Sequence, residues 1–308
     1  QDVTFATGTT VAENIVDFDG LYYKDCVFAN GSQWKLTTAG ADRFRYWFDG
    51  CDIDSAGVFG GAVWRFVACQ LDGAIQWLLT ASEGTKPHNV CILHSEITNY
   101  GGSSQIQWFS YATQQGNAMV GNVIEADTSD VTPSQLLSIC EDSAFDIDHI
   151  IIAHNTIVGE RSNIFYQSTG STTYYSRGLR VTGNIFTELD TKHDVFGTPD
   201  ANRIGRWDFN YGCGVRGNFS DNNNFPPEYP GEPWTLTGNP DFVDDQTDGA
   251  GGGDYTLGAS SDCLNLLAAG DGALVLCDLY GTLWRNDGTD AAGAINNGAS
   301  GNPWYYYA

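Results

Sequence analysis

Basic residues are scarce in this sequence. The 308-residue chain has 14 Lys+Arg against 38 Asp+Glu, which gives a formal net charge of −24. A surface this acidic repels nucleic acid and anionic membranes, so we expect neither as a partner. Such a surface favours Ca²⁺, which prefers oxygen ligands.

Long apolar runs and helical periodicity are also missing. No run approaches the roughly 18 consecutive apolar residues of a membrane span. No long stretch holds the 3.6-residue apolar period of a helix. The 37 glycines and the aromatic content of 13% are typical of many short strands and turns. We therefore predict an all-β protein.

The cysteine pattern excludes two common motifs. No C-x-x-C occurs, which argues against a zinc site or a thioredoxin-like motif. An even count of 8 cysteines is typical of disulfides in exported proteins. The chain also begins at Gln1 rather than Met, so we expect a processed protein that is secreted or held at the cell surface. The short interval between Cys263 and Cys277 predicts a disulfide there.

A short triplet recurs along the chain: a small polar residue or Cys, then any residue, then an apolar one. A second strand-like segment follows it at variable distance, and Ile75–Leu79 and Ile106–Ser110 are near copies of one another. Constant strands with variable connections are typical of a solenoid. The first positions of the triplets are Cys26, Cys51, Cys69, Ser95, Asn122, Asn155, Asn184 and Asn223.

These first positions are expected to form a structural ladder inside the protein. Successive coils of a solenoid place equivalent residues about 4.8 Å apart. Asn amides at that spacing can hydrogen-bond along the stack, and Cys fits the same position as a small hydrophobe. His94 and His154 each precede a ladder residue. Strand alternation therefore predicts that both histidines face outward and are exposed.

The repeat divides the chain into three parts of a single elongated domain. Residues 1–20 are expected to form an N-terminal cap, since the first rung would otherwise expose a sheet edge. Residues 21–225 form about eight or more coils. Residues 226–308 form a Gly/Asp-rich C-terminal segment of further coils or a cap, with an aromatic tail.

The C-terminal segment carries motifs in a distinctive order. They are Asn239–Asp244, Gly253–Leu257, Ser260–Asn265, Asp278–Gly281 and Gly288–Ile295. This order resembles the ending of secreted bacterial right-handed parallel β-helix proteins of the pectate-lyase-like superfamily. Leu264-Asn265 and Ala292 depart from the usual pattern. The resemblance implies the fold but no single function, because that fold carries lyases, hydrolases, tail spikes and adhesins.

A polysaccharide lyase on this fold needs a base and a group that neutralises the substrate carboxylate. Lys192 or His193 could abstract the proton, and Arg203 or Arg206 could hold the carboxylate. An ordinary polar loop between rungs is the alternative interpretation. The net charge also argues against an acidic substrate, whose approach it would slow.

Calcium is the one cofactor that the sequence predicts. Aspartates crowd a glycine-rich loop, and oxygen ligands on a flexible loop suit Ca²⁺. The spacing is not that of an EF-hand, so we expect a bound ion to stabilise the C-terminal segment rather than to take part in catalysis. The predicted ligands are Asp241, Asp244, Asp245, Asp248 and Asp254.

Aromatic residues supply two further candidate sites. Trp77 and Trp108 could stack as a sugar-binding platform, or they could form an aromatic ladder inside the solenoid. The C-terminal tail carries four consecutive aromatics, and exposed apolar patches usually have partners. Docking of the tail on a neighbouring subunit and its folding back as a cap are both open. The tail residues are Trp304, Tyr305, Tyr306 and Tyr307.

Three functions remain for this sequence. The first expectation is an extracellular structural or adhesive β-solenoid that assembles with itself, as an oligomer or filament, through its ends and tail. The second is a carbohydrate-active enzyme, with a polysaccharide lyase first among them. The third is a non-catalytic glycan-binding module.

Overall fold

The computed structural model describes the strands of the chain and the corners between them. The described ranges are 4–5, 10–12, 20–28, 33–35, 45–54, 57–59, 63–72, 75–78, 89–98, 106–110, 114–115, 117–125, 137–141, 147–148, 151–158, 180–187, 214–216, 218–220, 235–236, 239–244 and 253–264. Within these ranges the protein is all-β. None of them contains a helix long and apolar enough to cross a membrane.

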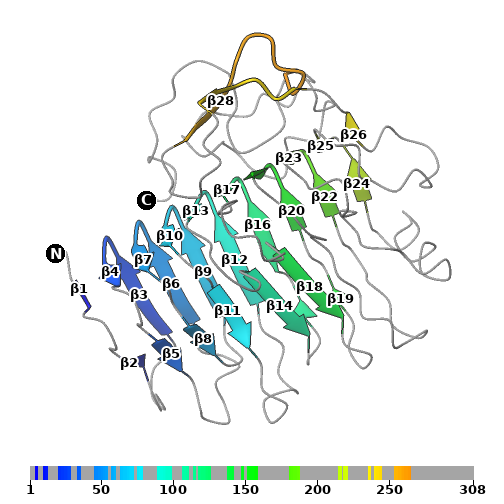
Figure 1. Cartoon of the computed structure of the whole chain (residues 1–308). Helices are drawn as coiled ribbons and strands as arrows, with labels where there is room; N and C mark the ends of the chain where they lie inside the picture. Colours follow the sequence, from blue (N-terminus) through cyan, green and yellow to red (C-terminus); the bar gives the residue numbers. More distant parts are fainter. Residues whose placement is uncertain are drawn as a thin grey trace, which may run out of the picture.

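Three parallel sheets contain most of the strands (Figure 1). Sheet A consists of β1 (Thr4–Phe5), β4 (Val27–Phe28), β7 (Asp52–Asp54), β10 (Gln70–Asp72), β13 (Glu96–Thr98), β17 (Val123–Glu125), β21 (Thr156–Val158), β23 (Ile185–Thr187), β25 (Asn218–Ser220) and β26 (Thr235–Leu236). Sheet B consists of β2 (Thr10–Ala12), β5 (Gln33–Lys35), β8 (Gly57–Phe59), β11 (Ile75–Leu78), β14 (Ile106–Ser110) and β18 (Leu137–Glu141).

Sheet C completes the stack. It consists of β3 (Gly20–Lys24), β6 (Arg45–Asp49), β9 (Val63–Val67), β12 (Asn89–Leu93), β16 (Ala118–Val120), β20 (Ile151–Ala153), β22 (Arg180–Thr182) and β24 (Gly214–Arg216). Two small sheets remain: the parallel pair β15 (Gln114–Gln115) and β19 (Ile147–Asp148), and an antiparallel hairpin of β27 (Phe242–Asp244) and β28 (Asp254–Leu257).

The chain visits the large sheets in a repeating order. From β3 to β14 it passes through sheets C, A and B in turn, and each strand pairs in parallel with its equivalent one coil later. We call one such passage a coil. Regular parallel pairing between successive coils is consistent with the predicted parallel β-helix.

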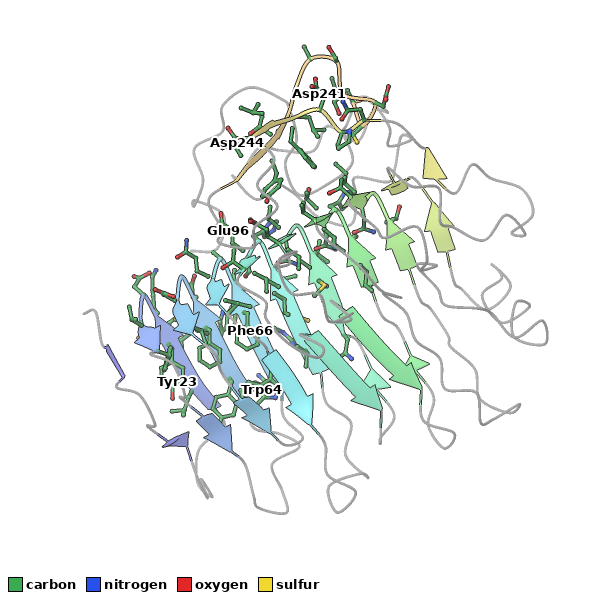
Figure 2. All side chains as sticks on the ribbon, viewed as in Figure 1. Tyr23, Trp64, Phe66, Glu96, Asp241 and Asp244 are labelled. Atoms are coloured by element: carbon green, nitrogen blue, oxygen red, sulfur yellow. The ribbon has the colours of Figure 1, made fainter. Side chains whose placement is uncertain are left out.

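Aromatic rings fill the interior of the first coils. On sheet C, Tyr46 stacks on Trp64 with ring centroids 4.1 Å apart, and Phe48 stacks on Phe66 at 4.9 Å. All four side chains are buried, and Figure 2 labels Trp64 and Phe66 on these strands. In the following coils, buried Ile92, Met119 and Ile152 continue the register of Phe66. The core therefore changes from aromatic to aliphatic along the stack.

A two-residue corner joins seven strands of sheet C, from β3 to β22, to the next strand of sheet A. The second residue of the corner is the ladder position, and the first has a positive φ. The first residues are Asp25, Gly50, Ala68, His94, Gly121, His154 and Gly183. A left-handed residue turns the chain sharply and ends the strand alternation on which the histidine prediction relied.

The prediction that His94 and His154 are exposed is therefore wrong. His94 is 7% exposed and His154 is fully buried. Gly121 occupies the next corner with φ +67°, and a Cβ built on it would lie 2.7 Å from His94 Nδ1. The buried imidazole thus requires glycine at that corner.

The C-terminal hairpin packs on the outer face of sheet A (Figure 1). Tyr255 contacts Val123 and Val158, whereas Leu257 and Cys263 contact Ile185. Figure 2 shows Asp241 and Asp244 on this hairpin, above the sheet.

The predicted disulfide between Cys263 and Cys277 is not formed, because Cys263 is a free thiol. Its side chain is fully buried in the cluster with Ile185 and Leu257, so it points into the sheet A contact. This burial raises its pKa to about 12. Cys277 itself lies outside the described ranges.

Candidate ligand-binding face

The predicted ladder residues lie at the corner between sheets C and A. Asn122, Asn155 and Asn184 stack at one corner. Nδ2 of Asn122 donates to Oδ1 of Asn155 at 2.9 Å, and Nδ2 of Asn155 donates to Oδ1 of Asn184 at 2.9 Å. Each Nδ2 also donates to a main-chain carbonyl of the preceding coil at 2.9–3.0 Å.

The earlier ladder positions reproduce part of this pattern. The thiol of Cys69 donates to the carbonyl of Phe48 at 3.6 Å, and the thiol of Cys51 donates to that of Tyr23 at 3.5 Å. Ser95 links the two halves, because its hydroxyl accepts the Cys69 N–H at 3.1 Å. Its own N–H donates to Asn122 Oδ1 at 2.9 Å. These side chains therefore bond within the stack and are buried together with Cys26.

The register also identifies the rung after Asn184. Ile185 pairs with Phe219 and Phe186 with Ser220, so Asn218 lies beside Asn184. The repeated triplet predicts the next ladder residue at Asn223, which lies outside the described residues. The triplet Asn218–Ser220 was overlooked because a long connection separates it from the triplet at Asn184.

The outer face of sheet C carries the most exposed aromatic side chains of the described chain. Tyr22 is 57% exposed and Trp47 is 48% exposed. Their rings meet edge to face with centroids 6.0 Å apart. Tyr22, Trp47 and Arg65 are register partners on β3, β6 and β9. We call these three residues, together with Arg45 and Lys24, the outer aromatic patch.

Alternation along the strands produces this patch. In β6, Tyr46 and Phe48 are buried, whereas Arg45 and Trp47 are exposed. The same alternation makes Trp64 and Phe66 internal in β9 and leaves Arg65 only partly buried. The sheet thus presents one aromatic ladder to the core and a second, shorter aromatic row to solvent.

Hydrogen bonds orient two members of the patch. The Tyr22 hydroxyl donates to Asp49 Oδ2 at 2.7 Å, and this bond to the carboxylate is the main cause that raises the Tyr22 pKa to about 12. Arg65 Nη1 donates to the carbonyl of Trp64 at 2.8 Å, which holds the guanidinium along its own strand. The patch therefore offers aromatic faces and cationic donors for binding. No group of it is arranged as a general acid–base pair.

The described structure includes only some of the sequence-predicted catalytic and binding residues. Trp77 and Trp108 are register partners on β11 and β14, in sheet B. Lys192, His193, Arg203 and Arg206, the lyase candidates, fall outside the described ranges. So do Trp304, Tyr305, Tyr306 and Tyr307 of the tail.

The predicted calcium ligands are described in part. Asp244 and Asp254 are opposite each other in the hairpin. The Asp241 carboxylate accepts the Ser260 N–H at 3.3 Å, and Asp254 accepts the Thr256 N–H at 3.0 Å. No group of three or more His, Cys, Asp or Glu side chains within the described residues is placed to hold a metal. Asp245 and Asp248 lie beyond them.

Sequence reasoning missed the outer aromatic patch, although the signal was available. Counting back from each cysteine of the ladder, the third residue is internal and the fourth is external. This count places Tyr22 before Cys26, Trp47 before Cys51 and Arg65 before Cys69 on the outside. Comparison of the chain with protein-family models, with curated proteins and with solved structures gave no match.

Proposed function

We propose that this chain is an extracellular structural or adhesive protein built as a right-handed parallel β-helix. The continuous corner ladder from Cys26 to Asn184 is the observation that carries the proposal. Its buried side chains are used to join coils. A stack joined in this way is a stiff rod, suited to spacing or anchoring rather than to closing around a substrate.

Self-assembly through the ends of the rod is part of the proposal. Within the described strands, sheet C begins with β3 and ends with β24, and both are parallel strands of the same sheet. Terminal strands of a sheet are templates for pairing with another chain. Pairing of one end with the other end of a second copy is head-to-tail and generates a filament.

Size-exclusion chromatography and electron microscopy test the assembly. The full chain is compared with a variant lacking residues 303–308, at several protein concentrations. We expect concentration-dependent oligomers or filaments from the full chain, and fewer or shorter ones from the truncated variant. A monodisperse monomer in both samples would sink the assembly proposal.

A further inference from the structure

We propose that the outer aromatic patch binds an acidic polysaccharide whose chain lies along the axis of the coil stack. The sugar rings stack on Tyr22 and Trp47, and Arg45 and Arg65 hold the carboxylates. This inference goes beyond the structural role proposed above. It concerns the single chain in solution, so it does not depend on self-assembly.

Two exposed aromatic rings provide the binding surface. Tyr22 and Trp47 leave about half of their surface in water, whereas Tyr46 and Phe48, next to Trp47 in sequence, are completely buried. Because the two rings are in contact, they form a contiguous exposed apolar patch, and such patches often mark binding sites. Aromatic faces pack against the C–H face of a pyranose while the sugar hydroxyls stay in water, which suits a partly exposed site.

The spacing of the strands is close to the repeat of a linear polysaccharide. Tyr22, Trp47 and Arg65 lie on successive parallel strands, which are about 4.8 Å apart. A pyranose ring in a linear polysaccharide has a comparable length. A polysaccharide laid along the axis therefore meets one of these residues for each sugar.

The charged side chains of the patch indicate which class of sugar it binds. The outward positions of β3 and β6 include Lys24, Arg45 and Asp49, and Arg65 follows on β9. The carboxylate of Asp49 is bonded to the Tyr22 hydroxyl, so it is turned toward the patch's own side chain. Asp25, whose charge also acts on Tyr22, is the second carboxylate beside the patch. Three cations against two carboxylates leave the patch with a small positive excess, and guanidinium groups bind carboxylates through paired donors.

The net charge of −24 does not prevent this binding. At physiological ionic strength, charges more than about 8 Å apart are largely screened. A ligand on the patch therefore meets mainly the local cations, while the distant carboxylates slow its approach. The same negative charge disfavours a second copy of this acidic chain as the occupant of the patch.

Affinity electrophoresis and calorimetry on the full chain test the proposal. The ligands are polygalacturonate and alginate as acidic polysaccharides, a neutral glucan, and polyglutamate as an acidic polymer without sugar rings. We expect binding to at least one acidic polysaccharide, and binding at least tenfold weaker to the glucan and to polyglutamate. Equal binding to polyglutamate would reduce the site to simple charge attraction and overturn the proposal. Absence of binding to both uronate polymers would overturn it as well.

Variants assign the binding to the patch. Trp47→Ala is expected to weaken binding at least tenfold, and Trp47→Tyr, which keeps a ring, to restore most of it. Arg65→Gln and Arg45→Gln should each weaken binding severalfold and reduce its salt dependence. Val243→Ala is the matched control, because Val243 is 63% exposed on the hairpin, away from the patch. Unchanged binding by Trp47→Ala, with its circular dichroism intact, would contradict the proposed site.

Discussion

Nδ2 of Asn155 donates to Oδ1 of Asn184 at 2.9 Å, and Oδ1 of Asn155 accepts both the main-chain N–H and Nδ2 of Asn122. One side chain therefore joins three coils. This relationship makes the ladder a chain of mutually dependent bonds, because each amide is both donor and acceptor for its neighbours.

Asn155→Ala is expected to be among the most destabilising single substitutions in the stack. It leaves two donors of Asn122 and the carbonyl of Met119 without their partner in a dry interior. We expect a loss of about 3 to 5 kcal/mol, measured by urea unfolding. Ser95→Ala, which removes only two hydroxyl bonds, should cost about 1 to 2 kcal/mol. Equal costs for the two variants would contradict the ladder's cooperative role.

Phe48 and Trp47 are neighbours in sequence but face opposite sides of sheet C. Phe48 stacks on both Tyr23 and Phe66, so Phe48→Ala should cost about 3 to 5 kcal/mol of unfolding free energy. Trp47 is half exposed, so Trp47→Ala should cost about 1 kcal/mol or less. Thermal and chemical unfolding of the two variants measures the difference. A reversed order would mean that the faces of β6 are misassigned.

His94 makes the stability of the stack depend on pH. Burial lowers its pKa to about 4 from an ordinary value of 6.5, so the folded state holds the imidazole neutral. The unfolded chain binds a proton below about pH 6.5, and the stability contribution is therefore full above that value. It is lost as the pH falls toward about 4, by about 3 kcal/mol in total.

The variant His94→Asn isolates this effect, because Asn tolerates the positive φ of that corner and does not titrate. Urea unfolding at a series of pH values compares it with the natural chain. We expect the slope of stability against pH between about 4 and 6.5 to be shallower in the variant. Carboxylates titrate in both proteins and cancel in the comparison. Parallel slopes would show that His94 is protonated without cost.

Tyr255 fixes the C-terminal hairpin to sheet A. Its ring lies edge to face against Phe242 at 5.2 Å and packs on Val123 and Val158. Tyr255→Ala should release the hairpin while the coils stay folded, because the cluster it completes lies outside the stack. Limited proteolysis is expected to cut residues 239–264 at least tenfold faster, with little change in far-ultraviolet circular dichroism. Uniform loss of structure would show instead that hairpin and coils unfold as one unit.

The sequence could predict the stacking because a ladder has a local signature. A small residue two before an apolar one, repeated from Cys26 to Asn184, needs no knowledge of the connections. Strand alternation gave a wrong prediction where the chain changes direction. His94 and His154 sit at left-handed corners, and alternation does not extend through a corner.

The contact between the C-terminal hairpin and sheet A could not be predicted from the sequence for a different reason. The outward position of sheet A is occupied in successive coils by Val27, Asp52, Gln70 and Glu96, and then by Val123, Thr156 and Ile185. The side chains at this position are buried only from Val123 onward, which marks the covered region. These equivalent positions can be aligned only after the register of the strands is known, because the coils differ in length.

The change of core along the stack gives the two halves a different response to cold. The first coils are joined by stacked rings and thiols, whereas the later ones add amide-to-amide hydrogen bonds to an aliphatic interior. Stabilisation by apolar burial weakens on cooling, whereas amide hydrogen bonds do not share this dependence. Near freezing, the N-terminal coils are therefore the half of the rod that loosens first, and the outer aromatic patch lies on them.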